Sequence, residues 1–414
     1  VIQIAERDEL LELESDKENN KSSNMVKYDK LEELVNSKFA SINKAIELNK
    51  KPQQYCDDVA QTWIKFCSLL QMDYNNFYRT TSENHKKLSQ EFLFKIRDII
   101  KLKEYSGRYC TGCESFKTEK EITNNECEYH PGLQLLNLTE NNFTFPLSKF
   151  KNLDLSEILI DKTLQNELNS IIENFGEISI SRESVDWGID IPFSNQKMYV
   201  WFEALLNYVF AIGYKPNLID FLNFSQHWKN SLIICGKDNL KFQAFILPAI
   251  LSAAGIPAPH RVLVHGMILD YNGKKMSKSL GNVVDPVEQI EKFGINAVRY
   301  YFLAGLNTFQ DSSYSESELI NKYNSDLANN YGNLFARVTT IAQEIINNYD
   351  IPDDLYNLDI IKDGRYIGNK YNISALIHYV PESEFIKNAN SEIEKAHTEL
   401  QTNFNVKNCF SIVN

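Results

Sequence analysis

The sequence predicts an α/β fold, with part of a doubly wound (Rossmann-type) sheet over residues 151–303 and helices over 304–414. Strand and helix patterns alternate through the first of these regions. Within it, the run SLIICG (residues 231–236) is apolar without interruption, which is typical of a parallel strand buried on both faces. Helical patterns dominate from Glu316 onward, which predicts a helix bundle.

The composition is that of a globular protein with room for two or three cores. The chain has 414 residues, of which 43% are apolar and 24% charged, and its formal net charge is −12. This charge argues against an indiscriminate coat of nucleic acid, but it permits local basic grooves. We therefore do not expect DNA as a partner. We do not expect a membrane either, because no stretch is long and apolar enough to cross a bilayer.

The cysteines and the N-terminal residues bear on the compartment. Seven cysteines, an odd number in a long chain, favour a reducing compartment in which thiols do not act as covalent staples. The first residues are acidic, so they predict neither a secretory signal nor an Arg-rich presequence. The expected location is therefore the cytoplasm or an organelle matrix, either mitochondrion or plastid.

Helices are predicted before residue 105. Residues 1–37 are a divergent or disordered segment, although a helical pattern capped by Asp29 begins within it and is expected to end at Pro52. Residues 57–70 form an amphipathic helical pattern. A further helix is expected after residue 85, running to about Lys103.

Residues 105–150 carry a spacing typical of metal ligands. The pattern C-x2-C-x13-C-x2-H is formed by Cys110, Cys113, Cys127 and His130. Two knuckles that each place two ligands on a tight turn can close a tetrahedral zinc site. The alternatives are four chance positions or a remnant that has lost its metal. The other cysteines (Cys56, Cys67, Cys235 and Cys409) have no partner at such spacing and are expected to be small buried residues.

The alternating region provides strand ends at which ligands of a doubly wound sheet bind. Residues 154–173 are expected to be helical, residues 198–202 (MYVWF) are strand-like, and residues 203–210 continue as an apolar helix. The strand at residues 231–236 is followed by Lys237, Asp238 and a helix. Another strand is predicted at residues 261–265 (RVLVH).

A lysine-rich loop follows this last strand. Residues 273–286 read GKKMSKSLGNVVDP, and they place the ammonium groups of Lys275 and Lys278 three residues apart. Two such groups can gather around a triphosphate as negative charge builds on its leaving oxygens. The alternative is a solvated Lys/Ser loop. Asp285 and Pro286 predict the N-cap and first position of a helix that Gly294 ends, and a second helix is expected at residues 296–303.

The motifs, taken in order, resemble the methionyl-tRNA synthetase family of class I aminoacyl-tRNA synthetases. The match runs from about Pro52 to Arg337 and more weakly beyond. Its motifs include NNFYRTTSENH, YSGRYCTGCESFKTEKEI, SVDWGIDIP, MYVWFEALLNY, IICGKDNLKF, VLVHGMILDYNGKKMSKSLGNVVDP and LANNYGNLFAR. The single Cys3His knuckle pair is similar to the bacterial or organellar type of this family.

The resemblance implies a domain organisation. Residues 38–104 would be a remnant of the first catalytic half, 105–150 a zinc-knuckle connective insertion, and 151–303 the second catalytic half with the KMSKS loop. Residues 304–414 would be an anticodon-binding helical domain that stops before its expected final helices. The implied activity is ATP-dependent ligation of methionine to tRNA(Met) through methionyl-adenylate, with Mg²⁺-bound ATP as substrate and a structural Zn²⁺.

The resemblance also implies roles for individual residues. The ATP-binding positions are Gly236, Lys237, Asp238, Lys275, Met276, Ser277, Lys278 and Ser279, of which the two signature lysines would be catalytic. Trp201, Ala204 and Tyr208 would line the methionine pocket, since aromatic faces accept a polarizable thioether. Asn333 and Arg337 would read the anticodon. The alternatives are core aromatics for the pocket residues and a solvated helix face for the Asn/Arg pair.

The chain departs from the family pattern in three respects. It has no HIGH-type sequence, so an N-terminally incomplete synthetase, an incomplete gene model or a non-catalytic tRNA-binding module are alternatives to an active ligase. Gln243 and Leu247 stand where the family would place histidine and tryptophan, and Glu203 stands where aspartate is usual. These changes bear on amino-acid specificity more than on the fold.

Overall fold

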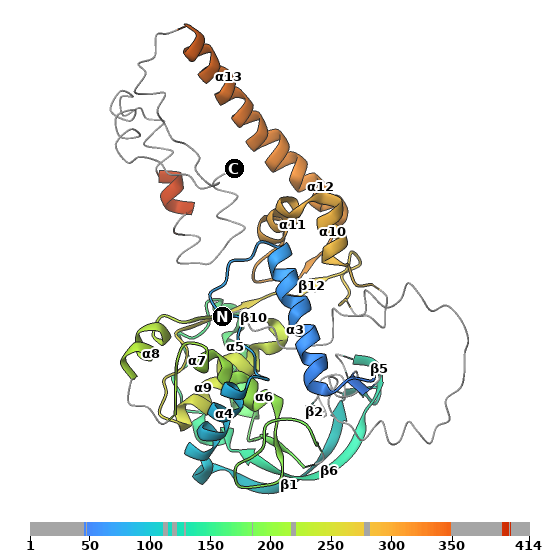
Figure 1. Cartoon of the computed structure of the whole chain (residues 1–414), viewed down its shortest axis with the longest axis vertical. Coiled ribbons are helices and arrows are strands. Elements are labelled where there is room, and N and C mark those ends of the chain that lie inside the picture. Colours follow the sequence, from blue (N-terminus) through green and yellow to red (C-terminus); the bar gives the residue numbers. More distant parts are fainter. Residues whose placement is uncertain are drawn as a thin grey trace, which may run out of the picture. The chain divides into compact units, whose positions relative to one another are not determined.

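The structure, a computed structural model, describes residues 45–46, 48–110, 115–117, 122–127, 130–183, 185–216, 221–276, 282–348, 391–396 and 398. Contacts divide the chain into two compact units, Val1–Val264 and His265–Asn414 (Figure 1). The segment 1–37 and the helix predicted from Asp29 lie outside the described residues. None of the helices in the described ranges is long and apolar enough to span a bilayer.

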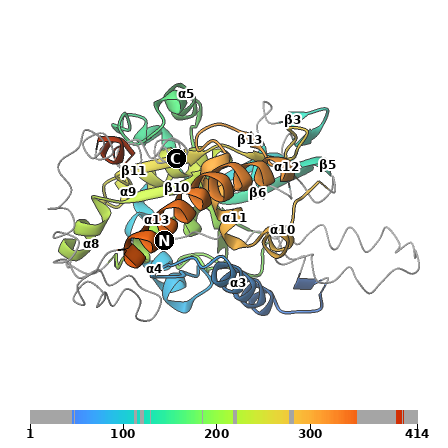
Figure 2. The ribbon, with the colours of Figure 1, turned by 90° about the horizontal axis from the view of Figure 1, so that it is seen from above.

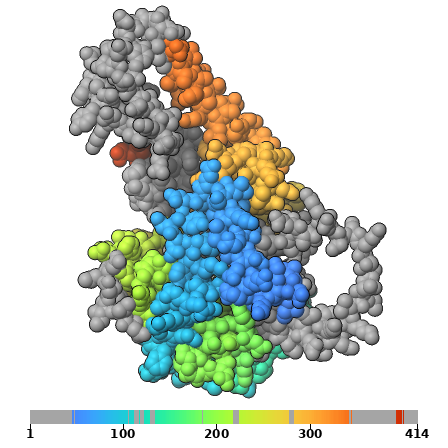
Figure 3. Space-filling view, viewed as in Figure 1, coloured from blue at the N-terminus to red at the C-terminus, as the bar shows by residue number. Residues whose placement is uncertain are grey.

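The first unit begins with two helices whose ends differ from the prediction. Helix α3 (Pro52–Leu69) starts five residues before the predicted Asp57, because Pro52 occupies its first turn, where proline is tolerated. Helix α4 (Glu83–Lys95) is capped by Ser82, whose side chain accepts the backbone N–H of His85 at 3.2 Å. In the space-filling view these helices (blue to cyan) form one continuous surface (Figure 3).

The prediction of a helix running to Lys103 is wrong. A short 3₁₀ turn follows α4, and strand β1 (Lys101–Cys110) begins where the helix was expected to continue. Strand β1 pairs antiparallel with β6 (Leu136–Phe145) from Lys101 to Tyr109. This long-range pairing overrides the local helical pattern. The two strands curve together at the lower end of Figure 1, in a sheet of order β2-β1-β6-β7 whose outer strands are β2 (Ser115–Lys117) and β7 (Ile178–Ser179).

The segment that carries the predicted metal ligands folds into short hairpins. Strand β2 (Ser115–Lys117) returns along β1 with Cys110 opposite Ser115. Strands β3 (Ile122–Thr123), β4 (Glu126–Cys127) and β5 (His130–Gln134) form a separate sheet, with Cys127 opposite His130. The turn between β3 and β4 holds Asn124 and Asn125 at positive φ, as a two-residue hairpin of the type I′ class requires.

The main core of the first unit lies between α4, the segment from Val200 to Phe210, and the strands β10 (Leu232–Gly236) and β11 (Arg261–His265). Helix α9 (Leu247–Ala253) connects these two strands, and Leu159 adds a parallel bridge to Val262. The strands confirm the predicted strand–helix–strand order. Burial of β10 on both faces is wrong, however, because Ile234 is 61% exposed while Ile233 and Cys235 are buried.

Two further expectations in this region needed correction. The helix predicted for residues 154–173 is confined to α5 (Gln165–Asn174), which a 3₁₀ turn capped by Asp161 precedes. The strand predicted for residues 198–202 is short: β9 (Lys197–Met198) ends before α6 (Val200–Glu203) begins. Trp201 and Phe202, two of the bulky residues that suggested a strand, belong to α6 instead.

The second unit combines one small sheet with consecutive helices. Strands β12 (Ile268–Leu269) and β13 (Ser312–Ser313) pair in parallel. Helix α10 (Pro286–Phe293) confirms its predicted caps, because Asp285 accepts the N–H of Val287 at 2.8 Å and Gly294 adopts a φ of 80°. The helix predicted from Asn296 is α11 (Ile295–Tyr300), which a π-helical turn extends.

A long helical run follows Ser315, whose side chain caps it. It comprises α12 (Glu316–Lys322), a π-helical segment, and α13 (Asn333–Asn348). Figures 1 and 2 show α12 and α13 along one line. Of the helix predicted for residues 382–402, residues 391–396 are helical and most of the remainder lies outside the described range.

Gly266, two residues before the start of β12, is a position where the structure admits no side chain. A Cβ there would lie 2.1 Å from the carbonyl oxygen of Gln310, whereas a Cβ at Gly176 would have nothing within 4 Å. We expect Gly266→Ala to lower the free energy of unfolding of the second unit by about 1–3 kcal/mol, because a backbone atom must move. Gly176→Ala is the matched control, expected within about 0.5 kcal/mol of the parent. Denaturant unfolding monitored by hydrogen exchange of each unit would measure both, and equal effects would contradict this packing.

Candidate functional site

The three predicted pocket residues lie on one side of a continuous helical segment in the first unit. Trp201 belongs to α6, Ala204 begins the following 3₁₀ turn, and Tyr208 belongs to α7 (Asn207–Phe210). Their spacing of three and four residues places side chains on the same helical face. Ala204 and Tyr208 are buried, and Trp201 is half-buried.

A second helical segment meets this face. The indole of Trp201 stacks on the ring of Phe242, with centroids 4.2 Å apart and an angle of 14° between the ring planes. One residue further along, the Gln243 amide donates to the Tyr208 hydroxyl oxygen at 3.0 Å, and both side chains are buried. Gln243 therefore fixes the position of Tyr208 within the core, a contact that the sequence did not predict.

Burial keeps the Tyr208 hydroxyl neutral. Desolvation raises its pKa well above the ordinary value, the charge of Cys235 adds to this, and the hydrogen bond from Gln243 offsets it in part. Trp201, Phe242, Tyr208 and Gln243 thus form one aromatic and weakly polar cluster of side chains, called the aromatic lining below.

The end of β10 brings further predicted residues toward this lining. Gly236 is the N-cap residue of the 3₁₀ turn Lys237–Asn239, and Asn239 donates to the Asp238 carboxylate at 3.0 Å. Burial raises the pKa of the Cys235 thiol to about 12, with a further contribution from the charge of Asp238.

A buried contact between His85 and Glu203 holds the same helical segment. His85 Nε2 and Glu203 Oε2 are 2.7 Å apart, and both side chains are buried. Tyr78 and Phe210 pack edge-on against the imidazole, with centroids 5.6 Å and 5.5 Å away. Glu203 directly precedes Ala204, so the pair connects α4 to the segment that carries the pocket residues.

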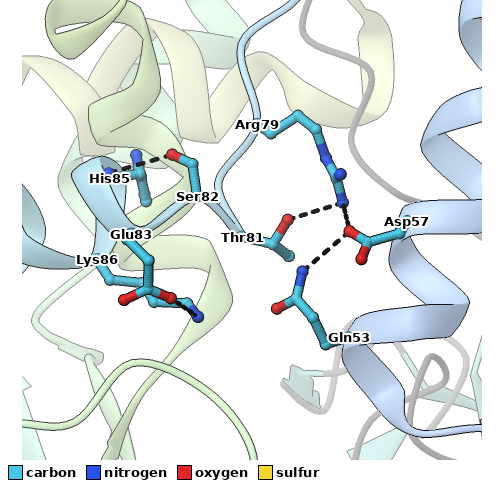
Figure 4. Close-up of polar contacts among 8 residues, drawn as sticks. All are labelled: Gln53, Asp57, Arg79, Thr81, Ser82, Glu83, His85 and Lys86. Atoms are coloured by element: carbon cyan, nitrogen blue, oxygen red, sulfur yellow. Dashed lines mark hydrogen bonds and ion pairs between the residues drawn. The ribbon is translucent and has the colours of Figure 1, made fainter.

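The chain entering α4 has its own polar anchor (Figure 4). The Arg79 guanidinium lies 2.7 Å from the Asp57 carboxylate and donates to Thr81 Oγ1 at 2.9 Å. The Gln53 amide also donates to Asp57, at 3.0 Å. These contacts fasten the NNFYRTTSENH segment to α3. The motif signalled this segment in the sequence, but its residues carried no assigned role.

The lysine loop belongs to the second unit. Lys275 is exposed, and its backbone forms an antiparallel bridge with Leu269, while Met276 is half-buried. Ser277, Lys278 and Ser279 lie outside the described residues. The structure therefore describes one of the two predicted catalytic lysines, together with the strand and helix that flank the loop.

The predicted anticodon residues share one face of α13. Asn333 and Arg337 lie one turn apart and are both exposed. Leu334, Phe335 and Val338 on the same helix are also exposed, at 59%, 63% and 55%. In the described residues this helix thus presents a mixed polar and apolar surface.

Two of the four predicted zinc ligands are close together in the described structure. Cys110 and Cys127 are buried in one small cluster with Leu135. The β4–β5 pairing places the backbone of His130 opposite Cys127, while Cys113 and the side chain of His130 lie outside what is described. No group of three or more ligand-type side chains occurs among the described residues. The buried thiols of Cys110 and Cys127, with His130 opposite Cys127 in the strand pairing, are residue types that commonly bind zinc.

Comparisons with known proteins identify the family of the chain. A family model described as tRNA synthetases class I (M) matches residues 39–137 and 133–339. Over 320 residues the chain is 37% identical to "Methionine--tRNA ligase" of Nostoc sp., covering 74% of this chain and 60% of that protein. It is 38% identical over 310 residues to "Methionine--tRNA ligase, chloroplastic/mitochondrial" of Arabidopsis thaliana, covering 71% of this chain and 50% of that protein.

A solved structure gives the same result. The crystal structure of Mycobacterium tuberculosis methionyl-tRNA synthetase bound by methionyl-adenylate matches with a TM-score of 0.74 and 26% identity, covering 91% of this chain and 72% of that one. The chain thus spans between half and two thirds of the two relatives described above. It has the mixed α/β architecture of a class I synthetase catalytic domain. The chain belongs to the class I tRNA synthetases, within the family (M) that its methionine–tRNA ligase relatives represent.

Proposed function

We propose that this chain activates methionine with ATP and transfers it to tRNA(Met). The observation that carries the proposal is the lining formed by Trp201, Tyr208 and Gln243 next to the end of β10. An aromatic wall with one neutral hydroxyl matches a thioether side chain, which is apolar and accepts only weak hydrogen bonds. In the first step a methionine carboxylate oxygen attacks the α-phosphorus of Mg²⁺-bound ATP, and the bond to pyrophosphate breaks.

The strand end and the lysine loop would act on the nucleotide. Gly236, Lys237 and Asp238 follow the strand at which a doubly wound sheet binds its ligand. Lys275 and Lys278 would neutralise the negative charge that moves onto the departing pyrophosphate, with Met276, Ser277 and Ser279 completing the loop. No side-chain nucleophile is required, because the phosphoanhydride and then the adenylate are already activated.

Transfer to tRNA would follow from the adenylate. A hydroxyl of the terminal ribose attacks the methionyl carbonyl carbon, and AMP leaves with the bonding electron pair. Asn333 and Arg337 on the exposed face of α13 would contact the anticodon, since an amide and a guanidinium can both donate to base edges. The alternative is a non-catalytic tRNA-binding module that would use the same helix.

ATP–pyrophosphate exchange tests the first step. We expect the purified chain to show methionine-dependent exchange. Lys275→Ala and Lys278→Ala are each expected to lower kcat by about 10²–10³-fold, because each removes charge stabilisation at the leaving group. Lys292→Ala is the matched control, since this lysine is in the same unit but pairs with Glu316 on a neighbouring helix.

One result would contradict the role of the loop lysines, and another would contradict activation itself. Exchange that persists in both loop variants would mean that the loop lysines are not catalytic. A folded parent chain that binds tRNA without any exchange would support the non-catalytic module. Glutamine and leucine in place of methionine serve as substrate controls, because neither should promote exchange if the aromatic lining selects the thioether.

The candidate zinc site would supply folding stability to the knuckle region. Cys110, Cys113, Cys127 and His130 would hold the ion as thiolates and a neutral imidazole. We expect about one equivalent of zinc by elemental analysis, because structural sites hold zinc tightly. Cys127→Ser should lose the metal and make residues 105–150 sensitive to protease, while Cys67→Ser, a buried cysteine of α3, should retain both properties. Less than about half an equivalent after gentle purification would argue against the site.

A further inference from the structure

Asp270 organises the chain on the N-terminal side of the lysine loop. Its Oδ1 accepts the backbone N–H groups of Asn272 at 2.9 Å and Lys274 at 2.8 Å. The backbone N–H of Asp270 donates to the Lys274 carbonyl at 2.8 Å, and Gly273 turns the chain at a φ of 75°. These contacts form a tight turn between β12 and Lys275, in which glycine supplies the left-handed conformation.

Asn282 brings the C-terminal side of the loop back to the same point. Its amide nitrogen donates to Asp270 Oδ2 at 2.8 Å and to the Lys275 carbonyl at 3.1 Å. An amide nitrogen carries two protons, so a single side chain can satisfy both acceptors. The two ends of the segment that contains Met276 and Lys278 are thereby joined through one carboxylate and one carboxamide.

The second oxygen of Asp270 distinguishes this arrangement from an ordinary turn. A turn closed by an aspartate requires only one oxygen to accept nearby backbone N–H groups. Here Oδ2 receives a donor twelve residues further along the chain. Asp270 is 4% exposed although residues 271–275 around it are exposed. Because water has little access to this carboxylate, its hydrogen bonds come from donors of the protein.

The protonation state of Asp270 is consistent with this geometry. The hydrogen bond from Asn282 is the largest influence that holds the pKa of Asp270 below its ordinary value, followed by the backbone N–H of Lys274. The carboxylate is therefore ionised at neutral pH and acts as an acceptor only. Charge-assisted hydrogen bonds of this kind are stronger than neutral ones.

We propose that Asp270 and Asn282 are positioning residues that join the two described ends of the lysine loop, so that Lys275 is presented to the triphosphate from a fixed base. This inference rests on the proposed function for its effect on catalysis, but the joined base can be tested without it. Neither residue touches substrate in this account. Both act by fixing the backbone at Lys275, whose carbonyl accepts from Asn282.

The kinetic test uses a matched series of variants. Asp270→Asn and Asn282→Ala should each lower kcat of ATP–pyrophosphate exchange by about 10–100-fold, since small displacements of a catalytic group are costly. The KM for methionine should change by less than about twofold, because the methionine lining is in the first unit. A general folding defect would instead move both constants or abolish activity.

Exchanging the carboxylate and the carboxamide between positions 270 and 282 tests their pairing more sharply. Asn282→Asp removes both amide donors and opposes Asp270 with a second carboxylate, so it should be slower than Asn282→Ala. The double variant Asp270→Asn/Asn282→Asp restores a carboxamide–carboxylate pair and should recover part of the loss. If the double variant is no faster than Asn282→Asp alone, the proposed pairing of these side chains is wrong.

Limited trypsin digestion tests whether the two ends of the loop are joined, and it does not depend on the catalytic activity of the chain. Cleavage after Lys274, Lys275 or Lys278, identified by mass spectrometry, should be about tenfold faster in Asp270→Asn and Asn282→Ala, because cleavage follows the population of the open segment. Asp326→Asn is the control, since this carboxylate of the same unit accepts from Lys322 and Tyr300 in the helical region. Unchanged cleavage in both variants would overturn the proposal. Faster cleavage in a chain that lacks exchange would retain the joined base and reject the proposed function.

Discussion

The first unit depends on one buried hydrogen bond, from the Gln243 amide to the Tyr208 hydroxyl. It joins the helical segment at residues 200–210 to the one at residues 242–253, and the Trp201–Phe242 stack lies beside it. His85 and Glu203 hold the first segment from its other side. The residues that would recognise methionine are therefore also core residues. A substitution here changes binding and stability together, because removing one partner leaves a buried polar group without its hydrogen bond.

The second unit follows a different principle. Under the proposed function, Lys275 meets charge that appears only during reaction, and this lysine is exposed and not part of the core. Order is supplied locally by Asp270 and Asn282, whose hydrogen bonds span the base of the loop. The parallel pairing of β12 with β13, which requires glycine at position 266, holds this base in turn. The residues proposed to select the amino acid thus include buried ones, whereas Lys275, which is proposed to stabilise charge, is exposed.

Local chemistry determined which features could be predicted from the sequence. Asp285, Pro286 and Gly294 define α10 by themselves, and the apolar run RVLVH became β11 because nothing nearby competes with it. The end of α4 was missed because β1 is stabilised by pairing with β6, a partner distant in the sequence. The same limit applies to the site. Trp201, Ala204 and Tyr208 lie within one short motif, whereas His85 meets Glu203 across 118 residues and Gln243 meets Tyr208 across 35.

Isothermal titration with methionine most directly tests whether residues of the first unit, and not the lysines of the second, recognise methionine. The account predicts that a double variant, Lys275→Ala/Lys278→Ala, binds methionine with the same Kd as the parent chain. Tyr208→Phe should weaken binding by about tenfold, because it removes one hydrogen-bonding oxygen from the buried lining. The opposite pattern, in which the lysine variant loses methionine and Tyr208→Phe binds normally, would contradict the assignment of methionine recognition to the first unit.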